Sequence, residues 1–184
     1  MKSKSLFFIF LMVCLVFFLT GCDSGGGGSS SGGGNERTDD PYPNIEVEPF
    51  LPDGFTPNTL YKSDVEIGEE TISGVDYVTK EISCVYLCSE GKFVASTTRI
   101  FINKSTNAVD DSKTEKKPNT KGSYSLTGNT SNGTLHATVT HEWDDDLIPP
   151  DWKDIPDEER NLPITNGAFT ISVSGFSITY RLSH

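Results

Sequence analysis

The stretch FTISVSGFSITYRL, residues 169–182, decides the fold. Apolar residues alternate with polar ones up to Ser174-Gly175, and beyond this dipeptide the alternation continues with the opposite parity. Two antiparallel strands joined by a two-residue turn explain this change of parity, and a bulge at Gly175 is the alternative. The turn predicts three facing pairs on one side of the hairpin: Val173 and Phe176, Ile171 and Ile178, and Phe169 and Tyr180.

Two further hairpins follow from similar patterns. Residues 134–143 carry apolar or aromatic side chains mainly at odd positions, which is typical of a half-buried strand. A loop over residues 128–133 would place Leu126 opposite Leu135 and Tyr124 opposite Ala137. A third hairpin would join residues 77–88 to 93–102 through Glu90-Gly91.

These hairpins predict an all-β domain. They account for six strands, and residues 44–50 and 60–67 are candidates for two more. Residues 156–160 could form one helical turn, with proline at its start. Because the hairpins follow one another along the chain, we expect an antiparallel meander barrel of six to eight strands, or a β-sandwich. Closure removes exposed strand edges, which favours the barrel.

The N-terminus carries the only long apolar run of this 184-residue chain, which excludes a multi-span membrane protein. Two lysines precede 14 consecutive apolar residues, 6–19, and the run ends in LTGC, residues 19–22. A run of this length after basic residues is typical of a secretory signal peptide. The ending resembles the lipobox of bacterial lipoproteins, which implies that residues 1–21 are removed and that Cys22 carries the lipid anchor in the cell envelope.

The chain divides into three parts. After the signal peptide, residues 22–41 contain the anchor cysteine and a Gly/Ser-rich tether, which we expect to be disordered, with a span of about 25 Å. Residues 42–184 form the single β-domain. The formal net charge of −11 argues against a nucleic acid partner.

A lipobox, a Gly/Ser spacer and the stretches GKFVASTTRIFIN, KGSYSLTGNTSNGTLHATV and FTISVSGFSITYRL together resemble the small lipocalin-like lipoproteins of spirochaetes. The resemblance covers residues 75–184 and implies a meander barrel with an apolar interior that could serve as a binding cup. The chain lacks the N-terminal Gly-x-Trp of true lipocalins. The predicted inward face of the strands supplies the candidate cavity residues: Ile82, Tyr86, Tyr124, Leu135, Val139, Trp143, Phe169, Ile171, Ile178 and Tyr180.

Candidates for metal or catalytic chemistry are few. Cys84 and Cys88 are four residues apart on a predicted strand, so their Cα atoms would lie about 13 Å apart, beyond the reach of a disulfide. We expect buried thiols; a disulfide through a turn at residues 85–87 and a metal site are the alternatives. His136 and His141 would point to opposite faces. With no recognisable catalytic motif, we expect no metal, no cofactor and no enzymatic activity.

The most unusual stretch is residues 141–163, HEWDDDLIPPDWKDIPDEERNLP, with both tryptophans and nine acidic residues against two basic ones. We expect a long connection that acts as a lid or as a protein contact, with calcium binding and a purely structural role as alternatives. Its candidate contact residues are Trp152, Asp144, Asp145 and Asp146. Residues 103–121 are expected to be a second, mobile and lysine-rich connection.

Two functions compete. The first is a membrane-anchored envelope lipoprotein whose barrel binds a small apolar or amphipathic ligand. The second is a surface protein-interaction or adhesin-type module that uses the acidic loop 141–163, since tryptophan is a favoured interface anchor.

Overall fold

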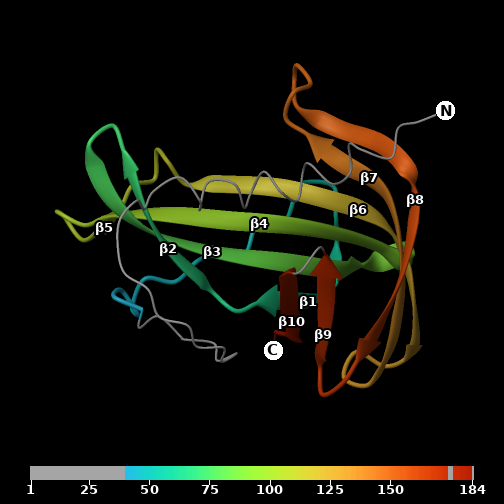
Figure 1. Cartoon of the computed structure of the whole chain (residues 1–184). Coiled ribbons are helices and arrows are strands. Elements are labelled where there is room, and N and C mark those ends of the chain that lie inside the picture. Colours follow the sequence, from blue (N-terminus) through green and yellow to red (C-terminus); the bar gives the residue numbers. More distant parts are fainter. Residues whose placement is uncertain (1–39, 174–175, 184) are drawn as a thin grey trace, which may run out of the picture. The chain divides into compact units, whose positions relative to one another are not determined.

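The computed structural model describes residues 40–173 and 176–183, which form an all-β domain (Figure 1). The predicted signal sequence, Cys22, most of the predicted tether and the turn residues Ser174 and Gly175 lie outside the described residues. Ten strands and one short 3-10 turn, η1 (Ser89–Gly91), follow one another along the described chain. The strands are β1 (Pro57–Ser63), β2 (Glu66–Ile72), β3 (Val75–Cys88), β4 (Lys92–Asn103), β5 (Ala108–Val109), β6 (Glu115–Gly128), β7 (Gly133–Asp144), β8 (Asp151–Ile164), β9 (Ala168–Val173) and β10 (Phe176–Leu182).

All strands belong to one antiparallel sheet, in the order β8-β7-β6-β4-β3-β1-β10-β9, with β2 beside β3 and β5 beside β4. Because β1 pairs with both β3 and β10, the first and last strands join, and the sheet curls into a nearly closed barrel of eight strands. The two end strands of this order, β8 and β9, meet at the bridge between Thr165 and Ala168. The predicted meander barrel is confirmed.

The predicted hairpin registers are also confirmed. Strands β9 and β10 pair Phe169 with Tyr180 and Ile171 with Ile178 without a register shift, as a two-residue turn requires and a bulge would not. Strands β6 and β7 pair Leu126 with Leu135 and Tyr124 with Ala137. Strands β3 and β4 are joined through Glu90-Gly91, both at positive φ (60° and 67°).

Two local predictions were wrong, and a third, the strand at residues 60–67, was correct only in part. Residues 44–50 form no strand. Residues 60–67 are divided between β1 and β2, which pair with successive parts of the long strand β3. Residues 156–160 lie in β8 rather than in a helical turn. Proline is tolerated in β8 because this is an edge strand, where an N–H that points away from β7 has no ladder partner to lose.

The two long connections are mostly strand. Strand β7 continues to Asp144 and β8 begins at Asp151, so the stretch 141–163 is a β-hairpin whose tip comprises residues 145–150. The stretch 103–121 likewise contains β5 and the beginning of β6. In β8 the period-two pattern is hidden because the charged residues Glu158 and Arg160 lie on the same side of the strand as the apolar Leu162.

The sheet has two apolar clusters, one on each face of β3 and β4. The interior cluster collects buried side chains from strands all around the barrel: Tyr61, Val85, Leu87, Phe93, Leu135, Ala137, Val139, Ile164, Phe169 and Tyr180. The outer cluster contains Val47, Val78, Ile82, Cys84, Tyr86, Cys88, Val94, Ile100 and Ile102. Residues 40–56, which we call the N-terminal strap, contribute Val47 and pack further apolar residues against this outer cluster.

Lys80 fastens the strap to the sheet. Its side chain is 3% exposed, and its Nζ donates to the carbonyl oxygens of Tyr42 (2.9 Å) and Ile45 (2.6 Å) and pairs with Asp40 Oδ2 (2.7 Å). At a second point, the Ser96 hydroxyl donates to the carbonyl of Phe50. The buried ammonium group is therefore fully partnered, as its burial requires.

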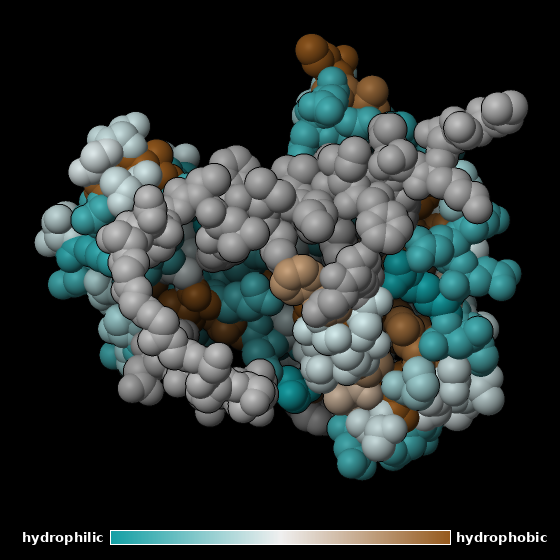
Figure 2. Space-filling model, in the orientation of Figure 1, coloured by the Kyte–Doolittle hydropathy of each residue, from teal (hydrophilic) through white to brown (hydrophobic). Residues whose placement is uncertain are grey.

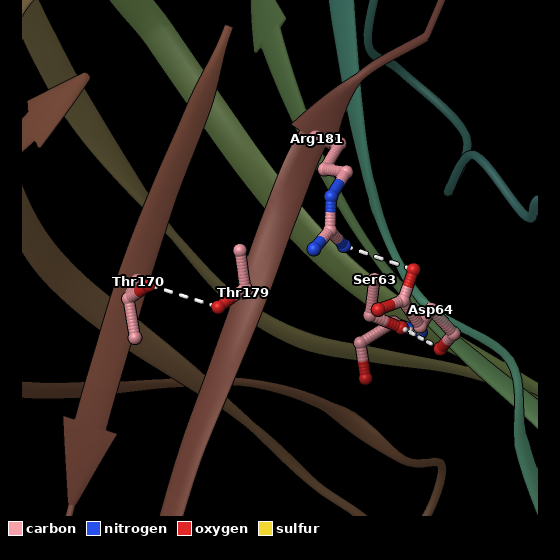
Figure 3. Close-up of polar contacts among 6 residues, drawn as sticks. Ser63, Asp64, Thr170, Thr179 and Arg181 are labelled. Atoms are coloured by element: carbon pink, nitrogen blue, oxygen red, sulfur yellow. Dashed lines mark hydrogen bonds and ion pairs between the residues drawn. The ribbon is translucent and has the colours of Figure 1, made fainter. Parts of the chain in front are cut away.

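Polar side-chain contacts reinforce the strand pairs β1–β10 and β9–β10 on the outside of the barrel (Figure 3). Arg181 of β10 contacts the carboxylate of Asp64, just beyond β1, at 2.9 Å. The hydroxyls of Thr170 and Thr179 are 2.9 Å apart between β9 and β10. The C-terminal hairpin is thus linked to the first strand by side chains as well as by the backbone ladder.

We predict that Lys80→Met lowers the free energy of unfolding by about 3 kcal/mol, because it leaves a carboxylate and two carbonyl groups of the strap without their cation. Urea denaturation followed by circular dichroism measures the change. Lys92→Met is the matched control, because Lys92 pairs with Glu90 in a fully solvated position (side chains 60% and 74% exposed) and should leave stability unchanged. Equal losses in the two variants would contradict a clamping role for Lys80.

Candidate interaction site

Seven of the ten predicted cavity residues lie together in or against the interior cluster: Tyr124, Leu135, Val139, Phe169, Ile171, Ile178 and Tyr180. They contact one another closely. Phe169 stacks on Tyr180 at 5.3 Å between ring centroids, and Tyr61 meets the edge of Phe169 at 5.0 Å. Their side chains therefore form a packed apolar centre at this level of the barrel.

The other three lie elsewhere. Ile82 and Tyr86 belong to the outer cluster, because β3 is apolar on both faces and its even positions point outward. Trp143 pairs with Trp152, which packs against the outer cluster. A bulge between Val139 and His141 adds one residue to β7 and reverses the parity of the strand. The assignment of these three residues to an interior face was wrong.

Two shallow grooves open on the described surface. One, of about 330 Å³, has a polar lining that includes Ser123, Ser125 and His136. The other, of about 400 Å³, lies by the start of β1 and includes Leu60, Tyr86 and Leu182 in its lining.

The β7–β8 hairpin is braced at its base by the two tryptophans. The rings of Trp143 and Trp152 lie directly opposite each other and meet edge to face, with centroids 5.3 Å apart and planes at 82°. The Lys121 ammonium group lies 4.6 Å from the Trp152 centroid. Burial lowers the pKa of Lys121, while Asp151 and Asp154 oppose this shift. These contacts give the hairpin a fixed direction.

The tip of this hairpin is apolar and exposed. Ile148 is 99% exposed and Leu147 is 40% exposed, and two prolines follow them. Figure 2 shows apolar atoms at the end of the projecting hairpin, above a hydrophilic base. Leu147 and Ile148 therefore form a small exposed apolar pair at the end of the hairpin.

The acidic candidates make hydrogen bonds and ion pairs within this tip. Asp144 accepts a hydrogen bond from the backbone N–H of Asp146 (2.9 Å), and Asp145 accepts one from Trp143 Nε1 (2.9 Å) and pairs with Lys117. Lys153 lies 3.3 Å from Asp144 Oδ2. Among residues 40–173 and 176–183, no group of three or more His, Cys, Asp or Glu side chains is arranged to hold a metal ion.

Cys84 and Cys88 are free, buried thiols on one face of β3, as predicted. Burial raises the pKa of Cys84 to about 11 and also raises the pKa of Cys88, so both are protonated at neutral pH. The two histidines occupy separate places. His136 contacts Asn161 (2.6 Å) and Thr127 (3.0 Å), whereas His141 Nε2 lies 2.8 Å from Asp154.

A row of charged residues crosses β2, β3, β4 and β6, and sequence reasoning missed it. Glu66 lies opposite Glu81, Glu81 opposite Arg99, and Arg99 opposite Glu115. Arg99 also pairs with Glu70 at 2.8 Å. Desolvation raises the pKa of Glu81, and Glu66 and Glu115 add to the shift, although Arg99 opposes it. The row is visible only once the register is known.

No family model, no curated protein and no solved structure matches this chain. Within the part of the chain that the structure describes, no helix is long and apolar enough to cross a membrane.

The hairpin can be tested by separating its base from its tip. We predict that Trp152→Ala lowers the free energy of unfolding by about 2 kcal/mol and shifts the emission of Trp143 to longer wavelength, because the facing ring is lost. Ile148→Asp should leave both unchanged, because this side chain contacts nothing in its own domain. Urea titration and fluorescence spectra measure these effects, and an unshifted Trp143 spectrum in Trp152→Ala would contradict the bracing.

The charged row predicts a pH-dependent effect at Glu81. Because the folded-state pKa of Glu81 is raised, its ionised form destabilises the fold above that pKa, and the penalty disappears below the unfolded pKa. Glu81→Gln should therefore raise Tm by a few degrees at pH 7 and leave it unchanged at pH 4. Glu69→Gln is the control, because Glu69 is 72% exposed and pairs with Lys104 on the described surface. A Tm gain at both pH values would contradict the titration of Glu81.

Proposed function

We propose that this chain is a lipid-anchored protein of the bacterial cell envelope, and that it binds a partner protein through the tip of the β7–β8 hairpin. The observation that supports this best is the complete exposure of Ile148 beside Leu147, at the end of a hairpin braced by two tryptophans. Apolar side chains held out on a rigid support can bind with little additional loss of conformational entropy.

The anchor is proposed from the sequence. The run of residues 6–19 followed by LTGC resembles a lipoprotein signal, which makes Cys22 the acylated residue. Two or three acyl chains would hold the protein on the membrane permanently. The tether up to residue 41 would let the barrel work about 25 Å from the bilayer.

The partner surface is expected to be an apolar pocket surrounded by basic groups. The tip has Leu147 and Ile148 at its end, and Asp144, Asp145 and Asp146 lead into it. Lys153 and Lys117 compensate part of this negative charge. The remaining carboxylates would favour a basic rim and repel acidic surfaces, including anionic lipid headgroups.

Binding of a small apolar or amphipathic ligand is the second candidate function. The groove of about 400 Å³ supports it, because Leu60, Tyr86 and Leu182 give its wall an apolar part. Native mass spectrometry of the full chain purified from its own envelope tests this function. A bound amphipathic mass that is lost in Leu60→Asp would support it, and a ligand-free protein would count against it.

The main proposal is tested by photo-crosslinking in the producing cell. We predict that benzoylphenylalanine at position 148 forms a specific adduct with one protein, and that Leu147→Asp reduces its yield at least tenfold, because a charge at the tip costs more than 1.4 kcal/mol of binding free energy. Position 106, in the exposed turn between β4 and β5, is the control and should give no such adduct. The same adducts at both positions, or no effect of Leu147→Asp, would overturn the proposal.

A further inference from the structure

The barrel has a seam between its two end strands, β8 and β9. Among the described residues these strands are joined by one bridge, in which Thr165 and Ala168 exchange both backbone hydrogen bonds (2.9 and 3.0 Å). The connecting turn has Asn166 and Gly167 at positive φ (52° and 73°), as in a two-residue hairpin turn. The β8–β9 hairpin therefore has a regular two-residue turn, but its backbone hydrogen-bond ladder stops after the pair of Thr165 and Ala168.

The register of β9 shows which backbone groups face the seam. In an antiparallel ladder, the N–H and C=O of alternate residues point to the same side. Those of Ala168 point towards β8, so those of Thr170 and Ser172 do so as well. The groups of Phe169 and Ile171 point the other way, towards Tyr180 and Ile178 of β10. Four backbone polar groups of β9 thus face the seam.

The same alternation on β8 explains why the ladder stops. Thr165 points towards β9, so the groups of Pro163, Asn161 and Glu159 face the seam, while Leu162 and Ile164 pair with β7. Pro163 would be the next residue to pair with Thr170, and proline has no N–H to donate. One missing donor at this position interrupts the ladder directly after the turn.

The floor of the seam combines apolar side chains with the ion pair of Arg160 and Glu158, which lies on the same side of β8 as Leu162, and the rim of the seam is acidic. Ile155, Leu162 and Ile171 are half-buried and pack against the interior cluster from the two sides of the seam. On the β8 rim, Asp157 and Glu159 are exposed. Strand β9 has neither charge nor proline, the devices that normally protect an edge strand from pairing with another chain.

We infer that this seam binds an extended strand of a partner protein by β-augmentation. Only a strand offers donors and acceptors along both edges together with apolar side chains at alternate positions for the floor. The acidic rim of β8 selects basic residues at the outward positions. The occupant therefore needs apolar residues that alternate with basic ones. A second copy of this chain is strongly acidic, and its Gly/Ser-rich tether has no alternating apolar residues, so neither fits the seam.

The test uses the full chain and a fluorescent octapeptide of alternating valine and lysine. We expect binding by fluorescence anisotropy, at least tenfold weaker in Thr170→Pro, which removes a seam-facing N–H, and within about twofold of wild type in Thr170→Val, which keeps it. If Thr170→Pro fails to fold, Asn161→Pro and Asn161→Gln provide the same comparison on the β8 edge, because Asn161 also faces the seam and carries no charge. An octapeptide of alternating serine and lysine, which has the charge but no apolar side chains, should not bind.

Amide hydrogen exchange locates the bound peptide. In the free chain, the amides of Thr170 and Ser172 should exchange rapidly and those of Phe169 and Ile171 slowly, and the valine–lysine peptide should protect the first pair. Protection of Thr170 and Ser172 before the peptide is added would show that no open edge exists. Any one of four results would overturn the inference: this early protection, absence of binding of the valine–lysine peptide, equal binding of the serine–lysine peptide, or unchanged affinity in the proline variants.

Discussion

The architecture depends on the burial of β3 and β4 on both faces. These two strands are the longest continuous pair near the middle of the sheet, and apolar residues occupy both their odd and even positions. The odd face contributes Val85, Leu87 and Phe93 to the barrel interior, so the even face needs a separate cover. The strap supplies that cover without forming a strand, and the Lys80 ammonium group donates to the strap carbonyls of Tyr42 and Ile45. A barrel wall that is apolar on both sides is therefore stable only together with the chain that leads into it.

Period-two alternation predicted the hairpins correctly because their inward residues are apolar and their turns are short. It failed where another requirement determined the residues. At Thr140 the bulge shifts the parity, and no local signal separates Trp143 from Val139. In β8, Glu158 and Arg160 face the same side as Leu162, next to the open seam, where charged groups can reach water. The pattern there resembles a loop although the backbone is a strand. Two turns could have been found: Ser73-Gly74 and Asn166-Gly167 are dipeptides that favour positive φ at both positions.

Apolar side chains are closely packed in the barrel interior but exposed at the hairpin tip. Phe169, Tyr180 and Tyr61 fill the centre with ring contacts, whereas Ile148 contacts nothing in its own domain. A lipocalin-like outline therefore does not by itself indicate a cup, since function resides in the site rather than in the fold. In this chain the packed interior cluster argues against the interior site expected from the sequence, while the acidic stretch forms a regular β-hairpin. The stretch that looked like a loose connection is a β-hairpin with two facing tryptophan rings at its base.

Strand β8 connects the tip and the seam, and its composition suits both. It begins beside the braced tip with Trp152 and ends beside the seam with Pro163, and it pairs along its length with β7 alone. Acidic side chains and prolines keep such an edge from pairing indiscriminately, because most strands carry neither the charge nor the spacing to compensate for them. The same features restrict productive partners to basic chains. The acidic side chains of β8 would thus have two effects at the seam. They would discourage pairing with unrelated strands, and they would favour a partner strand with basic residues.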